Sequence, residues 1–168
     1  MTYSISEKFK SLQGEGVYAG TPMAFIRFVG CSVGKKICQH CDTDFEVEHG
    51  WRGGGKFDSL ELLAWVDDYR HVCLTGGEPL DQDLEILFDE APEDVKFHIE
   101  TSGTKHPDWL DPGAHGPDGH HEVRNGGADG NNWAWRRLWI TASPKPGYLA
   151  SMILHADEIK VIAGGLGD

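Results

Sequence analysis

Short apolar runs alternate with amphipathic stretches along most of the chain. Runs typical of buried strands, bounded by Gly, Pro or charged residues, occupy residues 23–30, 71–75, 95–100, 138–142 and 158–162. Apolar side chains at helical spacing occupy residues 58–69, 82–90 and 148–154. Because strands and helices alternate, the pattern predicts a parallel α/β sheet with right-handed crossovers.

The first two predicted helices have expected caps and inward faces. Asp58 or Ser59 is expected to cap the first helix, since both side chains accept a hydrogen bond from the first turn. The inward positions of that helix are predicted to be Leu60, Leu63, Ala64, Trp65 and Val66. Those of the second helix are predicted to be Leu84, Leu87 and Phe88.

Three segments interrupt the alternation. Residues 6–16 begin with mixed polarity and end in Gly-Glu-Gly, which predicts a short strand running into a loop. Residues 51–56 contain three consecutive glycines and predict a flexible connection. Residues 107–132 are rich in Gly, Asp, His and Asn, which predicts a polar surface insertion. Its histidines are interpreted as loop residues in preference to the alternative, a metal site. Residues 1–168 are then expected to form a single domain, since roughly 150 residues is an ordinary domain size.

Charge and hydropathy narrow the choice of partner and compartment. The formal net charge is −12, from 27 acidic and 15 basic residues, which argues against a nucleic-acid partner. No apolar run approaches the roughly 20 residues of a membrane span, and residues 1–10 lack the features of a signal peptide. The sequence therefore predicts a cytoplasmic protein that binds neither nucleic acid nor membrane.

Three of the four cysteines lie within eleven positions, at Cys31, Cys38 and Cys41. Thiols so spaced can converge on one metal centre if the chain loops between them. The centre is either zinc, completed by His40 or His49, or an iron–sulfur cluster with one iron left open. Disulfides fit less well, because the thiols cluster instead of being spread along the chain. The fourth thiol, Cys73, lies inside an apolar run and is predicted to be a core residue.

A single cation, Arg27, interrupts the apolar run at residues 23–30. A charge on a buried strand needs a partner. One interpretation is a structural ion pair with a carboxylate. The other, favoured because Cys31 follows four residues later, is a guanidinium that holds the carboxylate of a ligand.

Polar residues follow three of the predicted strands, at residues 30–31, 75–78 and 100–102. In parallel sheets the carboxyl ends of the strands meet at one edge, where functional groups gather. The sequence therefore predicts a single site at this edge.

The motifs in these positions carry a resemblance to known proteins. The cysteine cluster with Gly76-Gly77-Glu78-Pro79 resembles the radical S-adenosylmethionine superfamily. Seven further motifs, in order along residues 11–160, make the chain resemble one family, 7-carboxy-7-deazaguanine synthase. They are Ser11-Leu12-Gln13-Gly14-Glu15-Gly16, Gly20-Thr21-Pro22, Phe25-Ile26-Arg27, Cys41-Asp42-Thr43, Glu100-Thr101-Ser102-Gly103, Ser143-Pro144-Lys145 and Asp157-Glu158-Ile159-Lys160.

The resemblance implies a fold, cofactors and a reaction. The expected fold is a partial, open (β/α) barrel of the radical S-adenosylmethionine type, reduced or truncated at the C-terminus. The implied cofactors are a [4Fe-4S] cluster, S-adenosyl-L-methionine and Mg²⁺. In this family the open iron chelates S-adenosylmethionine, and an electron from the cluster releases a 5′-deoxyadenosyl radical. The radical starts the ring contraction of 6-carboxy-5,6,7,8-tetrahydropterin to 7-carboxy-7-deazaguanine with loss of ammonia.

The resemblance also implies a place in metabolism and partners. The expected activity is that of a carbon–nitrogen lyase in queuosine-type 7-deazapurine biosynthesis. The expected partners are the carboxypterin substrate, a flavodoxin- or ferredoxin-type electron donor and a second copy of the chain in a homodimer.

The resemblance further assigns roles to individual residues. The implied cluster ligands are Cys31, Cys38 and Cys41, and Thr43 is the implied magnesium ligand through its hydroxyl. Without the resemblance, Thr43 would be interpreted as a turn residue. The implied cofactor pocket consists of His40, Cys41, Asp42, Gly76, Gly77, Glu78, Ser143, Pro144 and Lys145. The implied substrate site consists of Leu12, Gln13, Gly14, Glu15, Arg27 and Thr75, with Arg27 on the carboxylate and Glu15 on the pterin amines. No catalytic residue is implied beyond the cluster and the cofactor.

The chain departs from the family pattern in two places. Six residues separate Cys31 from Cys38, where the superfamily usually has three, so the loop is expected to follow a different path. The Gln-Pro pair of the family's C-terminal portion has no counterpart after Lys160. Two other functions remain open: an activating enzyme that forms a glycyl radical on a partner protein, and a non-enzymatic zinc module.

Overall fold

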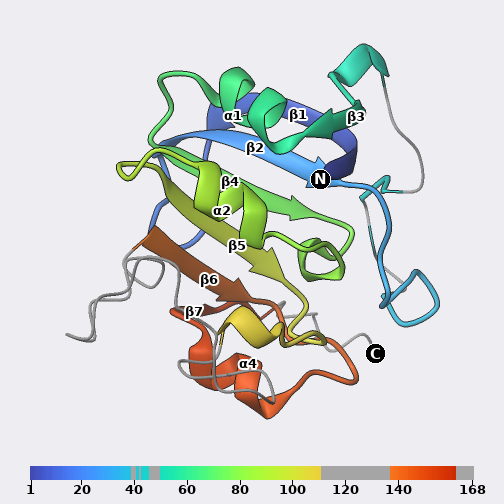
Figure 1. Cartoon of the computed structure of the whole chain (residues 1–168). Coiled ribbons are helices and arrows are strands. Elements are labelled where there is room, and N and C mark those ends of the chain that lie inside the picture. The colour runs from blue at the N-terminus through green and yellow to red at the C-terminus, as the bar shows by residue number, and fades with distance from the viewer. Residues whose placement is uncertain (39–40, 42, 46–49, 111–136, 162–168) are drawn as a thin grey trace, which may run out of the picture.

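The computed structural model of the chain describes residues 1–38, 41, 43–45, 50–110 and 137–161. The predicted insertion at residues 107–132 lies largely outside them, as do His40, His49 and Asp42. The described residues form one seven-stranded sheet in the order β3-β1-β2-β4-β5-β6-β7 (Figure 1). Its two edge strands, β3 and β7, are not neighbours in the described sheet, so the barrel is open, as predicted.

The five strands from β2 to β7 in the order of the sheet run parallel. They are β2 (Pro22–Phe28), β4 (His71–Gly76), β5 (Lys96–Thr101), β6 (Leu138–Ala142) and β7 (Glu158–Ile159). These strands confirm the predicted parallel sheet, and β6 has the predicted bounds. Within this set of five, each strand pairs with the one that follows it in the set. This is possible because the crossover between two such strands returns the chain to the same end of the sheet.

Two further strands extend the sheet in an antiparallel sense, which the sequence pattern did not predict. β1 (Thr2–Leu12) begins four residues before the expected start at Ser6, and β3 (Gly55–Asp58) forms within a segment predicted to be a flexible connection. Both pair through β1, which runs antiparallel to β2 and to β3. The prediction failed because β3 has a single apolar side chain, Phe57, and so shows no hydrophobic period.

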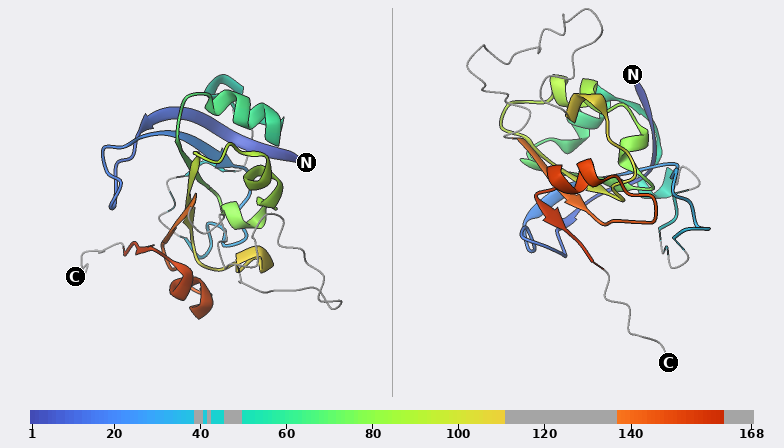
Figure 2. Two further views of the ribbon diagram at one scale, coloured as in Figure 1. Left: turned by 60° about the vertical axis from the view of Figure 1, so that its left-hand side comes forward. Right: turned by 90° about the horizontal axis from the view of Figure 1, so that it is seen from below.

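In the part of the chain that the structure describes, three helices and three short 3-10 segments connect the strands. The helices are α1 (Ser59–Val66), α2 (Glu85–Glu90) and α4 (Ala150–His155), and the 3-10 segments are η1 (Gly50–Arg52), η2 (Pro79–Asp81) and η3 (Asp108–Leu110). Helices α1 and α2 cover one face of the curved sheet, and the loop between β1 and β2 extends to the other side (Figure 2). No helix in the described ranges has the length and apolar content needed to cross a bilayer.

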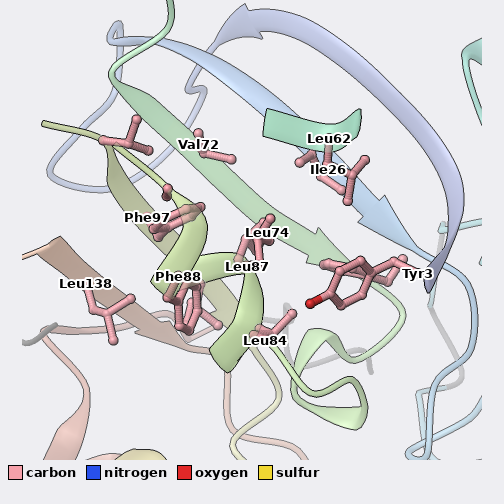
Figure 3. Packing of buried hydrophobic residues seen from close by; sticks show 14 of the residues in the cluster. Tyr3, Ile26, Leu62, Val72, Leu74, Leu84, Leu87, Phe88, Phe97 and Leu138 are labelled. Carbon is pink, nitrogen blue, oxygen red and sulfur yellow. The ribbon is translucent and has the colours of Figure 1, made fainter. Parts of the chain in front are cut away.

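The main core lies between the sheet and helices α1 and α2 (Figure 3). Alternate residues of the central strands, such as Val72 and Leu74, point to these helices and are fully buried. Leu84, Leu87 and Phe88 meet them from the α2 side, which confirms the predicted inward face of that segment. The helix itself starts at Glu85, three residues later than expected.

The prediction for α1 was right about its cap and partly wrong about its inward face. Asp58 caps the helix through a reciprocal capping box with Glu61. Leu62 and Val66 are buried, whereas Leu60 is 62% exposed. Ala64, also predicted to point inward, is exposed, while Leu63 and Trp65 are partly buried. Apolar residues surround this short helix, so spacing alone could not identify the face that meets the sheet.

A β-bulge in β1 exchanges the faces of its side chains. Ile5 pairs with Phe28 and Glu7 with Arg27, so Ser6 is an extra residue. Ile5 points to the main core, but after the bulge Phe9 points to the opposite face and stacks on Phe25 with ring centroids 4.9 Å apart. The bulge therefore supplies the inner face of the sheet with side chains from β1.

The inner face has a floor of packed aromatic and imidazole rings. Tyr18, from the loop after β1, contacts His71, His98 and Trp139. The two imidazoles share a hydrogen bond of 2.8 Å, and burial, with the nearby His71 and Lys96, lowers the pKa of His98 to about 3. His98 is therefore neutral at physiological pH. Cys73 lies beside this floor with no exposed surface, as predicted for a core thiol.

The two α1 leucines provide a direct test of the observed core face. Leu62→Ala should lower the free energy of unfolding by about 2–5 kcal/mol, because it leaves a cavity between α1 and the sheet. Leu60→Ala should change it by less than about 0.5 kcal/mol, because this side chain lies mostly in solvent. Chemical denaturation of both variants measures the difference, and equal losses would contradict the observed face of α1.

Candidate functional site

A cavity of about 490 Å³ opens where the parallel strands end. Side chains from β2, β4, β5 and β6, and the cysteine loop after β2, line it together. Its members among the predicted site residues are Leu12, Gln13, Gly14, Glu15, Arg27, Cys31, Cys38, Cys41, Thr43, Thr75, Gly76, Gly77, Ser143 and Lys145. Of the predicted site residues that the structure describes, Glu78 and Pro144 are outside this lining, and His40 and Asp42 lie outside the described residues. The structure thus brings nearly all of the described set into one place.

The three clustered cysteines are free, half-buried thiols that face this cavity. A turn accommodates the long first gap, because the carbonyl of Gly34 accepts hydrogen bonds from the amides of Ile37 and Cys38, at 3.2 and 3.1 Å. The Cys38 carbonyl then accepts from the Cys41 amide at 3.0 Å. The six-residue gap therefore lengthens the loop without moving Cys38 away from the cavity.

The three thiols are of the type that binds a metal, although in this structure they do not surround a common point. Within the described part of the chain, no three His, Cys, Asp or Glu side chains are placed to hold a metal ion as they stand. Burial raises the pKa of Cys31, and nearby Glu78 and Asp81 add to this. A bound metal reverses that effect by stabilising the thiolate, so ligand gathering and deprotonation are coupled to metal binding. Three thiols on one cavity wall thus have the right type and number for an open-site cluster.

Two glycines after β4 allow this strand to meet the start of the cysteine loop. A Cβ atom on Gly77 would lie 1.6 Å from the Gly30 carbonyl oxygen, and one on Gly76 would lie 2.5 Å from the Phe28 amide nitrogen. The Glu78 amide donates to the same Gly30 carbonyl at 3.1 Å. The backbone of residues 76–78 therefore packs directly on the backbone of residues 28–30. A side chain at either glycine would push these two segments apart.

Glu78 is fully buried and faces the protein instead of the cavity. Its carboxylate accepts from Thr101 Oγ1 at 2.7 Å and from the Ser102 amide at 2.8 Å. The Ser102 hydroxyl and the Leu80 amide also donate to it. These donors offset the cost of burying the charge, and they tie η2 to the end of β5.

Arg27 faces the cavity and also forms an ion pair. Its Nε donates to Glu7 Oε1 at 2.8 Å, and its Nη1 lies 3.4 Å from Thr43 Oγ1. The structural ion pair is therefore present, and the same guanidinium lines the cavity beside Thr43, so ligand binding by Arg27 stays a prediction. Sequence reasoning missed Glu7, because only the bulge in β1 turns this residue to the inner face.

Glu100 is a second site residue that the sequence analysis did not assign. It lines the cavity from the end of β5 and accepts from Thr75 Oγ1 at 2.8 Å and from Gln13 Nε2 at 3.1 Å. Its position at the carboxyl end of a strand, within a motif already noted, was the available signal. Glu100 therefore joins Thr75 of β4 to Gln13 of the loop after β1.

The loop after β1 is also tied to β7. Glu15 forms an ion pair with Lys160, and the Val17 amide donates to Glu158 at 3.3 Å. Lys160 lines the large cavity, and both carboxylates line a smaller one of about 200 Å³ beside it. Residues from both ends of the described chain thus meet across the open side of the sheet.

The segment after β6 completes the wall. The Ser143 amide donates to the Thr101 carbonyl at 2.8 Å, which holds the segment against the end of β5. Lys145 Nζ donates to Ser143 Oγ at 2.9 Å. Arg27, Lys145 and Lys160 give the wall cationic groups, whereas Glu15 and Glu100 are anionic. The cavity can therefore receive a ligand that carries both charges.

Comparison with known proteins identifies relatives of the chain. No family model matches it. The 7-carboxy-7-deazaguanine synthase of Bacteroides thetaiotaomicron is 35% identical over 169 residues, which cover 98% of this chain and 72% of the relative. The synthase of Escherichia coli K12 is 33% identical over 199 residues, which cover 100% of this chain and 75% of the relative. For the synthase of Bradyrhizobium diazoefficiens, 39% identity extends over 128 residues, so the matched part spans only 61% of that relative's length.

A solved structure supports the same relationship. The crystal structure of QueE from Escherichia coli matches with a TM-score of 0.67 and 30% sequence identity, over 96% of this chain and 70% of that one. The similarity in sequence and fold extends over nearly the whole chain. The chain therefore belongs to the 7-carboxy-7-deazaguanine synthase family.

Proposed function

We propose that the chain is a radical S-adenosylmethionine lyase that converts 6-carboxy-5,6,7,8-tetrahydropterin to 7-carboxy-7-deazaguanine. The observation that carries the proposal is that three thiols, a guanidinium and the glycine loop after β4 line a single cavity of about 490 Å³ in a chain of this family. Residues 1–168 act as one domain in this proposal, with the polar insertion at about 107–132 on its surface.

The proposed metal centre is a [4Fe-4S] cluster held by Cys31, Cys38 and Cys41. Three thiolates leave one iron for S-adenosylmethionine, and the reduced cluster with this cofactor supplies the radical that starts the reaction. Cys73 is the fourth thiol of the chain and has no exposed surface, so it does not compete for the open iron. This argues against a site with four cysteine ligands, whereas zinc completed by a histidine is distinguished by the iron and sulfide analysis below.

The proposed cofactor contacts lie on two segments of the cavity wall. Gly76 and Gly77 can offer backbone groups to the methionyl end, because neither has a side chain that shields its backbone. Ser143 and Lys145 would contact the cofactor from the segment after β6, and Pro144 would fix the backbone between them. Glu78 would act indirectly, by holding the glycine loop against β5. His40 and Asp42 complete the proposed pocket.

The proposed substrate site lies on the strands and the loop after β1. Arg27 would bind the pterin carboxylate through a charge-assisted hydrogen bond. Thr75 and Gln13, both bonded to Glu100, would contact the pterin ring with Glu15, while Leu12 and Gly14 would shape the wall. Glu100 joins this set because both of its neighbours belong to it. Thr43 would hold Mg²⁺ beside the carboxylate, since its hydroxyl lies next to Arg27.

Two partners are proposed, an electron donor and a second copy of the chain. Reduction of the cluster needs an electron donor of the flavodoxin or ferredoxin type. A homodimer is proposed for the assembled enzyme.

The activity can be tested on anaerobically reconstituted protein. Iron and acid-labile sulfide should each approach about four per chain, as a cubane held by three thiolates requires. With S-adenosylmethionine, a reductant and 6-carboxytetrahydropterin, the protein should form 7-carboxy-7-deazaguanine, detected by mass spectrometry. Omission of the pterin should lower the rate of cofactor cleavage.

Two results would overturn this function. One zinc per chain with no sulfide would indicate a zinc module. A cluster that cleaves S-adenosylmethionine at the same rate with or without the carboxypterin, and forms no deazaguanine, would indicate an activating enzyme for a protein substrate.

The ligand assignment predicts opposite outcomes for two cysteines. Cys38→Ala should lose the cluster and all product formation, because two thiolates cannot hold it stably. Cys73→Ala should keep the iron content, because its side chain is fully buried beside the floor of the inner face. Iron analysis and visible absorption spectra compare the variants, and loss of iron in both, or in neither, would show the assignment to be wrong.

The magnesium assignment predicts a change in metal dependence at Thr43. Thr43→Ala should reduce kcat/KM by about tenfold, which corresponds to about 1.4 kcal/mol, and should raise the Mg²⁺ concentration needed for half-maximal activity. Thr43→Ser keeps the hydroxyl and should behave like the wild type. An unchanged Mg²⁺ titration in Thr43→Ala would assign the residue to the turn alone.

A further inference from the structure

Glu7 lies between two arginines on the inner face of the sheet. Its Oε1 accepts from Arg27 Nε at 2.8 Å, and its Oε2 lies 3.4 Å from Arg52 Nη1. The Glu7 and Arg27 side chains are only 18% and 21% exposed, whereas that of Arg52 is 43% exposed. The Arg27 contact is thus the shorter and the better shielded of the two.

The bulge in β1 is the reason that Glu7 reaches Arg27. Tyr3 and Ile5 point to the main core, and regular alternation would turn Glu7 to that same face. The extra residue, Ser6, shifts the register so that Glu7 pairs directly with Arg27 on the inner face. Bulges often re-aim a side chain next to a functional site.

Ser6 itself has a second contact that supports a role for the bulge in the site. The residue is fully buried, and its hydroxyl donates to the Asp44 carbonyl at 2.7 Å. Asp44 follows Thr43, whose hydroxyl lies 3.4 Å from Arg27 Nη1. The bulge therefore fixes both neighbours of the guanidinium, namely Glu7 on one side and the Thr43 segment on the other.

The contact with Glu7 determines which edge of Arg27 can receive a ligand. A guanidinium presents donors in a rigid plane, and a carboxylate binds best across two parallel N–H groups. Since Nε donates to Glu7 and one Nη1 hydrogen can serve the 3.4 Å contact with Thr43, the edge left for a second carboxylate is formed by the other Nη1 hydrogen and Nη2. One carboxylate between two guanidinium groups also leaves one positive charge, which the carboxylate of a ligand would neutralise.

We infer that Glu7 is a positioning residue, which orients Arg27 so that the Nη1–Nη2 edge of its guanidinium receives the substrate carboxylate. This inference rests on the proposed function, in which Arg27 binds the carboxylate of the pterin. Glu7 acts through Arg27 and touches no reacting atom. Arg52 contributes less, because its side chain is more exposed and its contact with Glu7 is longer.

The test compares two ligands on anaerobically reconstituted protein with S-adenosylmethionine bound. Equilibrium dialysis measures the affinity for 6-carboxypterin and for 6-methylpterin, which differ only in the group that would meet Arg27. Wild type should prefer the carboxylate, and Glu7→Ala should reduce this preference by about tenfold, within the range found for side chains in direct contact. Affinity for 6-methylpterin should remain unchanged. Glu7→Gln, which keeps an acceptor but loses the charge, should fall between the two.

A double-mutant cycle tests whether the effect of Glu7 on the carboxylate preference depends on Arg27. Glu7→Ala added to Arg27→Lys should cause no further loss of preference, because lysine lacks the Nε that Glu7 holds. Asp94→Asn is the matched control, since Asp94 pairs with Arg70 at 2.7 Å far along the sheet and should leave both affinities unchanged. If Glu7→Ala does not fold, Glu7→Gln decides the question alone.

The possible results distinguish failure of the Glu7 positioning role from failure of the proposed function. If wild type prefers the carboxylate and the Glu7 variants retain that preference, the positioning role is wrong and the function stands. Equal loss of affinity for both pterins would indicate a structural role only, and would also overturn the inference. A wild type that does not distinguish the two pterins would contradict carboxylate recognition itself, and both proposals would fail.

Discussion

The close contact between the ends of β2 and β4 is the constraint on which the cavity depends. Gly77 lies so near the Gly30 carbonyl that no side chain fits between them, and the Glu78 amide bonds to that carbonyl. Cys31 follows Gly30 directly, so this contact sets where the cysteine loop leaves the sheet. Glu78 extends the constraint to β5 through Thr101 and Ser102. The ends of three strands are thereby fixed relative to one another by backbone packing and one buried carboxylate.

The inner face of the sheet has two parts, a floor of packed rings and a polar part at the carboxyl ends of the strands. Near the amino ends of the parallel strands, packed rings around Tyr18 and the neutral His98 close the floor. Toward the carboxyl ends, Thr75 and Glu100 replace these rings with hydrogen-bonding groups. Residues of one strand such as His98 and Glu100 share a face because side chains alternate. One strand can therefore build the floor and the site in two successive inward positions.

The antiparallel strand β1 adds what the parallel strands lack. Its bulge turns Glu7 toward Arg27, and the loop that follows it reaches Glu100 through Gln13 and β7 through Glu15 and Val17. The open side of the barrel is thus bridged by a loop, although the described strands do not close. Contacts of Gln13, Glu15 and Val17 connect this loop to β5 and to the β7 segment.

The sequence by itself determined the elements whose signal is local. The apolar run of β6, the Asp58 cap and the buried Cys73 follow from burial and capping rules that act over a few residues. The gathering of Arg27, Thr75 and the three cysteines also followed, because parallel strands end at one edge. Tertiary structure alone decided β3, the choice of Leu62 over Leu60, and the contact of Glu7 with Arg27. These depend on pairing register and on a one-residue bulge, and a shift of one residue in a strand exchanges its faces without leaving a local pattern.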